Sequence, residues 1–352
     1  MKTLKDVNLK GKKVVVRAEF NEPVENRALA DDTRICATLP TLEYIFSQKP
    51  EIVVILSHIG RPEGQRSEDL SNKIIIPALE KLTKRKVVLV EYLKDLMSLI
   101  SASGLNSDAI YLMENIRFWK EEKKGDPLFA KKIGELFDVY VNDCFSASHR
   151  DHASISSVPK HSKEKCAGLL FEQELRNLER VSKQPKHPAV MVIGGAKIKT
   201  KLPVIENLKD TYDKILVGGL IANEALDRKI ELGKKIVLPI DFAPIEKEDQ
   251  RLDIGPKTVE IFKKEIKDAK TIVWNGPMGK YEDAETAEGS KSVMKEIAQN
   301  SDAYQVVGGG ETLEVIDEFG HFSDFDYVSM SGGAMLEFLA GKDLPGVVAL
   351  ED

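Results

Sequence analysis

Two lysines follow a pair of glycines in the second half of the chain, in the segment GGAKIKTK. Lys197 and Lys201 have i, i+4 spacing, which predicts that their ammonium groups lie on one side of a helix start. Two cations at that place suit a phosphoryl group in transfer. The alternative is a solvated lysine-rich face, supported by Lys199 between them, and only the adjoining glycines favour the functional interpretation.

Glycine turns directly follow four predicted strands of the second half, in the segments AVMVI-GGAK, TIVW-NGPMG, YQVV-GGGET and YVSM-SGGAM. Glycine lets backbone amides approach a ligand closely, and a helix that starts just after it directs those amides and a partial positive charge at an anion. A single turn of this kind is explained equally well by a helix cap. Four together predict a phosphate crevice at one edge of a sheet, with a nucleotide as the ligand.

Several other classes of enzyme are disfavoured by motifs that the sequence lacks. A P-loop is excluded because no G-x-x-x-x-G-K-[ST] occurs. Gly308 and Gly310 form G-x-G, but Leu313 stands where a dinucleotide-binding fingerprint needs its third Gly or Ala, which argues against a dehydrogenase. Neither H-E-x-x-H nor G-x-S-x-G is present, which argues against a metal-centred hydrolase and a serine hydrolase.

Arginines occur at or just after predicted strand ends, or in the loops beyond them, in the first half of the chain. These loops are expected to open on the same edge of a sheet. Guanidinium groups bind phosphate and carboxylate bidentately, at ~1.5 to 3 kcal/mol for each charged hydrogen bond, so together they predict a site for a small polyanion. The alternative for any one of them is a silent surface ion pair. The arginines are Arg17, Arg34, Arg61, Arg117 and Arg150, with His58 and His149 predicted as further ligands and His152 as a structural residue.

Short runs of valine and isoleucine alternate with stretches of helical spacing along the chain. Continuous apolar runs of this length predict parallel strands covered on both faces. The first series is 13–16, 52–56, 87–90, 110–113 and 139–142, and the second is 189–193, 214–217, 236–238, 271–274, 305–307 and 327–329. Between the series, a charged amphipathic helix over 171–181 ends before Pro185 and Pro188. The chain is therefore predicted to form two α/β domains, with a boundary near this helix.

The composition indicates a folded protein without an electrostatic preference for large polyanions. The 352 residues suggest two domains at ~100 to 200 residues each. A formal net charge of -6 provides no overall positive field for nucleic acid or an anionic membrane. No signal peptide or apolar run of membrane-spanning length is visible. Cys36, Cys144 and Cys166 are odd in number and widely spaced, which argues against a disulfide framework or a structural zinc site and favours the cytosol.

Ten segments resemble, in the same order, the motifs of the phosphoglycerate kinase family, and the resemblance covers nearly the whole chain. They are RAEFNEP, DDTRI, LSHIGRP, MENIRF, NDCFSASHRDHAS, GGAKIKTK, LDIGPKT, WNGPMGKYE, GGGET and SGGAMLEFLAGKDLPGV. The resemblance implies an α/β fold of two Rossmann-like parallel-sheet domains joined by a hinge helix. It implies a phosphoglycerate-binding domain over 1–170 on which the tail 343–352 packs back, a hinge helix and linker over 171–187, and a domain binding Mg-ADP or Mg-ATP over 188–342.

The resemblance also assigns roles to individual residues. Arg34, Lys197 and Lys201 would form the catalytic set, with Lys201 at the nucleotide phosphates and Lys197 at the moving phosphoryl group. Substrate would be bound by Glu19, Asn21, Arg34, His58, Arg61, Arg117 and Arg150. The nucleotide would be bound by Gly195, Lys197, Lys201, Gly219, Asn275 (at the triphosphate), Glu282 (at the ribose hydroxyls), Gly308, Gly309, Gly310, Glu311 and Thr312, with Glu311 also as the Mg²⁺ ligand.

The chain departs from the family pattern at five places. Glu19 and Glu311 stand where the family has Asp, for the substrate hydroxyl and for Mg²⁺ respectively. Each change keeps the charge and lengthens the side chain by one methylene. The other departures are Thr200 for an Asp, Leu220 for a glycine in the adenine-pocket turn, and Met330-Ser331 for Thr-Gly.

The resemblance implies a reversible reaction of glycolysis and gluconeogenesis, 1,3-bisphosphoglycerate + ADP ⇌ 3-phosphoglycerate + ATP, in a cytoplasmic monomer that closes about its hinge. The sequence shows no evident acid–base pair, and none is needed because a carboxylate nucleophile is already deprotonated at neutral pH. Catalysis then consists of positioning and of neutralising charge. Two alternatives stay open, namely a paralogue that binds nucleotide or phosphoglycerate but transfers phosphate poorly, and a kinase of another phosphorylated carboxylate.

Overall fold

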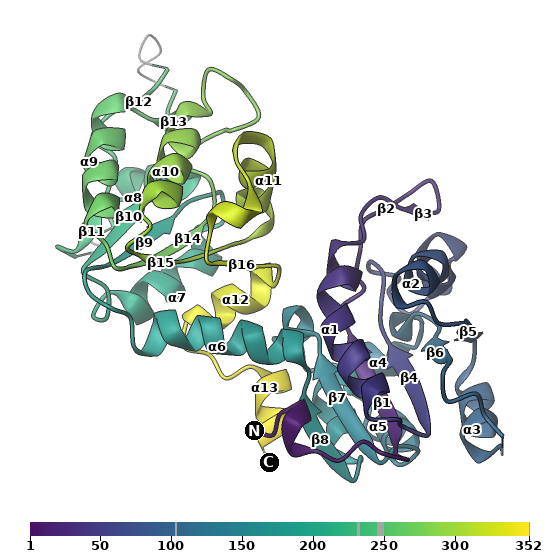
Figure 1. Ribbon diagram of the computed structural model, residues 1–352. Helices are drawn as coiled ribbons and strands as arrows, with labels where there is room; N and C mark the ends of the chain where they lie inside the picture. The colour runs from purple at the N-terminus through teal and green to yellow at the C-terminus, as the bar shows by residue number, and fades with distance from the viewer. Residues whose placement is uncertain (103, 231–232, 245–249, 352) are drawn as a thin grey trace. The chain divides into compact units, whose positions relative to one another are not determined.

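Two compact units make up the protein in the computed structural model, which describes residues 1–102, 104–230, 233–244 and 250–351. The first unit comprises Met1–Leu175 together with Asp343–Asp352, and the second comprises Arg176–Lys342. Each unit contains a six-stranded parallel sheet with helices beside it (Figure 1). The predicted α/β class with two parallel-sheet domains is confirmed.

The sheet of the first unit has the strand order β5-β6-β4-β1-β7-β8, and every neighbouring pair is parallel. All residues of the central β4 are buried, as expected for a strand covered on both faces. The strands are β1 (Lys13–Ala18), β4 (Ile52–Leu56), β5 (Val87–Val90), β6 (Ile110–Met113), β7 (Val139–Asp143) and β8 (Glu164–Ala167). The helices are α1 (Thr33–Ser47), α2 (Ile76–Thr83), α3 (Leu93–Ser101), α4 (Lys120–Lys123), α5 (Pro127–Gly134) and α13 (Pro345–Glu351).

The sheet of the second unit has the order β11-β10-β9-β14-β15-β16, again parallel throughout. Counted along the chain this is the doubly wound order 3-2-1-4-5-6, which reverses direction between β9 and β14. The strands are β9 (Ala189–Ile193), β10 (Lys214–Val217), β11 (Ile236–Val237), β14 (Thr271–Asn275), β15 (Tyr304–Gly308) and β16 (Tyr327–Ser329). The helices are α7 (Ile198–Leu208), α8 (Gly219–Asp227), α9 (Pro256–Lys267), α10 (Glu288–Gln299), α11 (Gly310–Phe319) and α12 (Gly332–Leu339).

All eleven runs predicted as strands form strands, with bounds that differ by two residues at most. The prediction missed β8, whose sequence EKCA is short and begins with two charged residues, as is common at the edge of a sheet. It also missed two hairpins of two-residue strands, β2 (Val24–Glu25) with β3 (Ala28–Leu29), and β12 (Phe242–Ala243) with β13 (Asp253–Ile254). Strands of that length carry no periodicity.

Helix α6 runs over Leu169–Lys183 and crosses the division between the two units, which falls after Leu175. It is longer at both ends than the predicted span of 171–181. Asp143, at the end of β7, accepts hydrogen bonds from the backbone N–H of Leu170 (3.0 Å) and of Phe171 (3.3 Å). The N–H of Leu169 donates to the hydroxyl of Thr41 in α1 (2.9 Å). The first turn of α6 is therefore fixed to the carboxyl edge of the first sheet.

A glycine is required immediately before this helix. A Cβ atom at Gly168 would lie 2.1 Å from Oδ1 of Asp143, which is buried. We expect Gly168→Ala to lower the free energy of unfolding by about 1 to 3 kcal/mol, measured by urea denaturation, because the added methyl group displaces the carboxylate that holds α6. Gly332→Ala is the matched control, since a Cβ there meets no atom within 4 Å. Equal stability of the two variants would contradict this account.

The C-terminal segment belongs to the first unit, where the N–H of Gly346 donates to the carbonyl of Ser148 (2.9 Å). Near the other end of the chain, Thr3 forms a parallel bridge with Ala167 of β8. Over the described ranges, none of the helices combines the length and the apolar character that a membrane crossing requires.

Candidate active site

Except for Arg34, the residues predicted to bind substrate follow the ends of strands of the first sheet. Because these strands are parallel, their carboxyl ends share one edge of the sheet. The order of connection reverses at β1, between β4 and β7, and such a switch point leaves a crevice for a ligand. We call this group the arginine site, comprising Glu19 and Asn21 after β1, Arg34 in α1, His58 and Arg61 after β4, Arg117 after β6, and Arg150 after β7.

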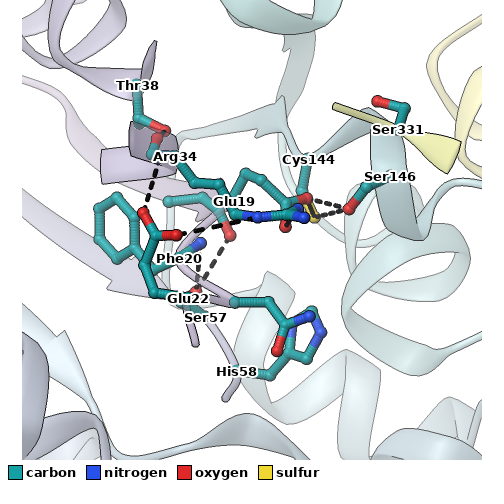
Figure 2. Close-up of polar contacts among 12 residues, drawn as sticks. Glu19, Phe20, Glu22, Arg34, Thr38, Ser57, His58, Cys144, Ser146 and Ser331 are labelled. Carbon is teal, nitrogen blue, oxygen red and sulfur yellow. Dashed lines mark hydrogen bonds and ion pairs between the residues drawn. The ribbon is translucent and has the colours of Figure 1, made fainter. Parts of the chain in front are cut away.

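Glu19 is buried and holds Arg34 in place. Figure 2 shows Glu19 next to Arg34, Cys144 and Ser146, and its carboxylate bonds to all three. Oε1 accepts from Nη1 of Arg34 at 3.1 Å, while Oε2 accepts from the thiol of Cys144 at 2.9 Å and from the hydroxyl of Ser146. Burial raises the pKa of the Cys144 thiol to about 12, so this group remains a protonated donor. Both oxygens of Glu19 are thus engaged by protein groups.

Glu22 supports Arg34 through the backbone. Its Oε1 accepts from the N–H of Arg34 (2.6 Å) and from that of Ile35 (3.0 Å), two donors in the first turn of α1 that have no partner within the helix. The N-cap residue Asp32 makes no side-chain capping bond, so Glu22 takes over that function from a distant loop. Burial raises the pKa of Glu22 to about 7. No local pattern could reveal this role.

The peptide of Gly60 links two other members of the arginine site. Its N–H donates to Oδ1 of Asn21 at 2.8 Å, and its carbonyl accepts from Nη1 of Arg117 at 2.9 Å. Burial lowers the pKa of Arg117 to about 10, with a further contribution from Arg17, and leaves it charged at neutral pH. The guanidinium of Arg117 is therefore held in a fixed position.

The remaining arginines differ from one another in exposure. Arg61 and Arg150 are exposed, and within the described part of the chain neither side chain makes a hydrogen bond or ion pair. Arg17 is the next-to-last residue of β1, at a strand end as predicted, but it is completely buried. It contacts His58, whose ring is also buried. His152 is partly buried, and burial lowers its pKa to about 4.

The glycine turns of the second unit pack against one another where β9 and β14 lie side by side. The N–H of Gly194 donates to the carbonyl of Asn275 (3.0 Å), and the N–H of Gly195 donates to that of Pro277 (2.9 Å). A Cβ at Gly194 would lie 2.0 Å from the Pro277 oxygen, and Gly195 has a φ of +84°. Glycine is needed here for close backbone contact between the two turns.

Three amides of these turns donate to carbonyl groups within the protein. The amides of Gly194 and Gly195 are used within the protein, and that of Gly219 donates to the carbonyl of Met278 (2.7 Å). The first-turn amides of three helices also lie at this edge. Helices α7, α11 and α12 begin after β9, β15 and β16, respectively, and none of the three has a side-chain cap. The first-turn amides and positive dipole end of such helices attract anions.

The two lysines lie in different environments, which corrects the prediction from their spacing. Lys197 is the exposed N-cap residue of α7, with φ -111° and ψ 81°, and so lies outside the helix where the i, i+4 rule applies. Lys201 is only 7% exposed, and its Nζ donates to the backbone carbonyl of Asn275 (3.1 Å) and to Oδ1 of the same residue. Burial lowers the pKa of Lys201 to about 8, although Glu311 opposes the shift.

Two predicted nucleotide-binding residues are buried behind the turns. Asn275 donates from Nδ2 to the carbonyl of Gly308 (2.7 Å) while its Oδ1 accepts from Lys201. The hydroxyl of Thr312 accepts from the N–H of Gly276 (2.6 Å). Both side chains are almost completely buried. In this structure they hold β14, β15 and the start of α11 together.

The acidic candidates of the second unit are exposed. Glu311 lies in the first turn of α11, and a Cβ added to Gly195 would lie 2.8 Å from its Oε2. Glu282 is in the loop that precedes α10. Among the residues that the structure describes, no group of three or more His, Cys, Asp or Glu side chains could enclose a metal ion.

The site has the properties of a phosphotransferase. One unit gathers arginines at a sheet edge, and the other gathers uncapped helix starts and lysines at the corresponding edge of its own sheet. Such groups stabilise the charge of a phosphoryl group during transfer and require no proton transfer of their own.

Comparisons with known proteins agree with this class. A sequence model described as phosphoglycerate kinase matches residues 4–243 and 225–342. The phosphoglycerate kinase of Thermosipho africanus (strain TCF52B) is 37% identical over 99% of this chain and 97% of its own length. That of Dictyoglomus turgidum (strain DSM 6724 / Z-1310) is 36% identical over 99% and 98%.

Two solved structures extend the similarity to the fold. Phosphoglycerate kinase from Coxiella burnetii has a TM-score of 0.89 at 33% identity, covering 99% of this chain and 98% of that one. Phosphoglycerate kinase from Pyrococcus horikoshii OT3 has a TM-score of 0.84 at 30% identity, covering 100% and 98%. The chain belongs to the phosphoglycerate kinase family. It is an enzyme, a phosphotransferase of glycolysis.

Proposed function

We propose that the first unit binds 3-phosphoglycerate or 1,3-bisphosphoglycerate at the arginine site, and that the second unit binds ADP or ATP at the glycine turns. The observation that carries the proposal is the division of cationic groups between two sheets. Arg34 and Arg117 are held by protein contacts at one sheet edge, and Lys201 and the uncapped start of α11 lie at the other. Each set suits one of two anionic substrates.

In the direction of ATP use, a carboxylate oxygen of 3-phosphoglycerate attacks the γ-phosphorus of ATP. The new P–O bond forms as the bond between that phosphorus and the β,γ-bridging oxygen breaks, and ADP leaves with that electron pair. No proton moves. Lys197, exposed at the start of α7, neutralises the transferring group, while Lys201 binds the nucleotide phosphates and Arg34 orients the carboxylate.

Glu311 is the residue that would hold Mg²⁺. A single exposed carboxylate fits this ion, which is usually bound by one or two carboxylates together with substrate phosphates. Bound there, Mg²⁺ would supply charge neutralisation at the phosphates. Glu282 is assigned to the ribose hydroxyls, and Gly219, Gly308, Gly309, Gly310 and Thr312 to the phosphate-facing turns.

Transfer requires the two substrates to meet, so we propose that the units close about α6, which is shared between them. The assigned domains are 1–170 with the tail 343–352, the hinge segment 171–187, and 188–342. The protein would act as a monomer in the cytoplasm, where its three free cysteines stay reduced, and its net charge of -6 disfavours nucleic acid as a partner.

The decisive experiment is an assay of ATP-dependent phosphorylation of 3-phosphoglycerate, coupled to glyceraldehyde-phosphate dehydrogenase. Turnover with Mg²⁺ is the expected result. Absence of turnover with both Mg²⁺ and Mn²⁺, while calorimetry still detects nucleotide binding, would instead support the non-catalytic paralogue. Turnover only with a different phosphorylated carboxylate would support the alternative of a kinase that acts on that substrate.

The affinity for ATP is expected to fall as pH rises above 8. The pKa of Lys201 is about 8, below its usual value of 10.5, so the side chain is charged below pH 8 and becomes neutral above it. If the phosphates require the charged form, the Kd for ATP rises by about tenfold between pH 7 and pH 9. The phosphates themselves titrate near pH 6 and do not contribute in this range.

Calorimetric titrations at several pH values test this dependence. Lys201→Met should bind ATP weakly at all of them, with the slope above pH 8 removed. A slope that persists in Lys201→Met would assign the pH dependence to another group.

A further inference from the structure

A continuous series of buried hydrogen bonds lies behind His58 in the first unit. It begins at Glu122 in the short helix α4, passes through Ser154 and Arg17, and ends at Nδ1 of His58. The carboxylate accepts from the hydroxyl (2.6 Å) and the N–H (2.7 Å) of Ser154. Arg17 donates from Nε to the Ser154 hydroxyl (2.9 Å) and from Nη2 to His58 (2.8 Å). All four residues are at most 3% exposed.

The direction of each hydrogen bond is determined by the chemistry of its donor. An arginine guanidinium only donates, so Nδ1 of His58 must accept and carries no proton. The proton of the neutral ring is therefore on Nε2, the nitrogen that Arg17 does not contact. An imidazolium would bring two N–H groups face to face at 2.8 Å, so this contact also disfavours the charged form.

Glu122 determines how Arg17 is placed. Because both oxygens of Glu122 accept from Ser154, the hydroxyl hydrogen of Ser154 is turned toward the carboxylate and a lone pair is left for Nε of Arg17. The carboxylate also supplies negative charge close to a completely buried guanidinium. Burial alone would lower the pKa of Arg17, but neighbouring groups that include the carboxylates of Glu122 and Glu19 outweigh it, so that pKa is raised.

The charged and titratable groups with the largest electrostatic effects on His58 act in the same direction. Arg17 in β1, Arg117 after β6, His152 before the π-helical segment 153–157, and Arg34 in α1 all oppose protonation of the ring. Burial is the largest cause, and together these effects lower the pKa of His58 well below its usual 6.5.

We propose that Glu122 is a positioning residue that acts through Ser154 and Arg17 to keep His58 neutral, with its proton on Nε2, as a hydrogen-bond donor to the phosphoglycerate. The donor role rests on the proposed function, whereas the tautomer does not. His58 would thus contribute one hydrogen bond of fixed direction, from Nε2–H to the ligand. The positive charge at the site would come from the arginines. Binding of the substrate should then show no increase when the pH falls through 6.5.

The tautomer can be measured directly in the full chain by two-bond 1H–15N correlation NMR after 15N labelling of histidine, with the His58 signal assigned by its loss in His58→Gln. We expect the Nε2–H form throughout pH 5.5 to 8 without substrate. A ring that titrates near pH 6.5, or that carries its proton on Nδ1, would overturn the proposal, even if the enzyme proves active in the coupled assay.

Glu122→Gln tests the remote carboxylate. An amide has one accepting oxygen, so one donor of Ser154 loses its partner and the charge near Arg17 is removed. We expect a mixed tautomer population or a titrating ring at His58, together with an increase of about tenfold in KM for 3-phosphoglycerate and little change in kcat.

Two further variants separate positioning from a general structural effect. Glu122→Asp should restore the Nε2–H signature in part, because it keeps the charge. Glu121→Gln, the exposed neighbour in the same helix, should leave both the spectrum and KM unchanged. An unaltered His58 spectrum in folded Glu122→Gln would refute the role of Glu122, and if that variant does not fold, the spectrum of the unmodified protein still decides the tautomer.

Discussion

Lys197→Ala is expected to lower kcat by about 100-fold or more while changing the Kd for ATP only slightly. Lys197 is exposed at the N-cap position of α7. Within the described part of the chain, its side chain makes no ion pair. In the proposed reaction, Lys197 meets charge that develops on the oxygens of the phosphoryl group during transfer. An interaction made mainly in the transition state contributes to kcat and little to ground-state affinity.

Lys199→Ala provides the control for this prediction, because Lys199 is also exposed and lies two residues further along, inside α7. Its kcat and Kd should match those of the unmodified enzyme. Steady-state rates in the coupled assay and calorimetric ATP titrations give both quantities. If Lys197→Ala loses affinity and rate by equal factors, this lysine binds the nucleotide in the ground state and its catalytic assignment fails.

Arg34→Ala is expected to weaken binding of 3-phosphoglycerate by about 100-fold and to leave the affinity for ATP unchanged. A guanidinium that makes two charged hydrogen bonds to a carboxylate contributes about 3 kcal/mol, which corresponds to that factor. The side chain of Arg34 is already oriented by its ion pair with Glu19 at 3.1 Å. The backbone N–H of Arg34 donates to Glu22, which fixes the position of the residue. The residues proposed to bind the nucleotide belong to the other unit, so the affinity for ATP serves as an internal reference.

Arg27→Ala is the matched variant for this measurement. Arg27 is an exposed arginine of the same unit that pairs with Glu68 and Asp69 at the surface. Calorimetry should find its affinities for both ligands unaltered. Parallel losses of phosphoglycerate and ATP binding in Arg34→Ala would contradict the division of substrates between the units. Arg34→Ala leaves the buried Oε1 of Glu19 without its partner. Thermal unfolding of both variants therefore shows whether a loss of stability contributes to the change in affinity.

Much of the fold could be predicted from local sequence. Runs such as IVVIL at β4 and AVMVI at β9 are apolar throughout because both faces of a parallel strand are covered, so they indicate a buried parallel sheet without any knowledge of their neighbours. The turn glycines were recognisable for a similar reason, since they directly follow such runs. The order of ten motifs was sufficient to identify the family, which the comparisons confirm.

The environment of each candidate side chain depended on tertiary structure. Lys197 and Lys201 looked equivalent by spacing. Lys197 is the exposed N-cap residue of α7, whereas Lys201 is buried against Asn275, 74 residues away in the chain. Arg17 resembled the loop arginines and is instead a core residue, bonded to Ser154 at a separation of 137 residues. Glu122 lies in the charged sequence KEEK, which is typical of a solvated surface, yet its side chain is completely buried.

The sequence by itself therefore determined the strands, the parallel architecture and the chemistry that the residue types allow, because these depend on periodicity and composition over a few neighbouring positions. Only the tertiary structure decided which cations are free to meet a ligand and which are held in the interior. Burial and hydrogen-bond partners are set by segments that are distant in the chain and adjacent in space, and they decide the charge and the direction of each functional group.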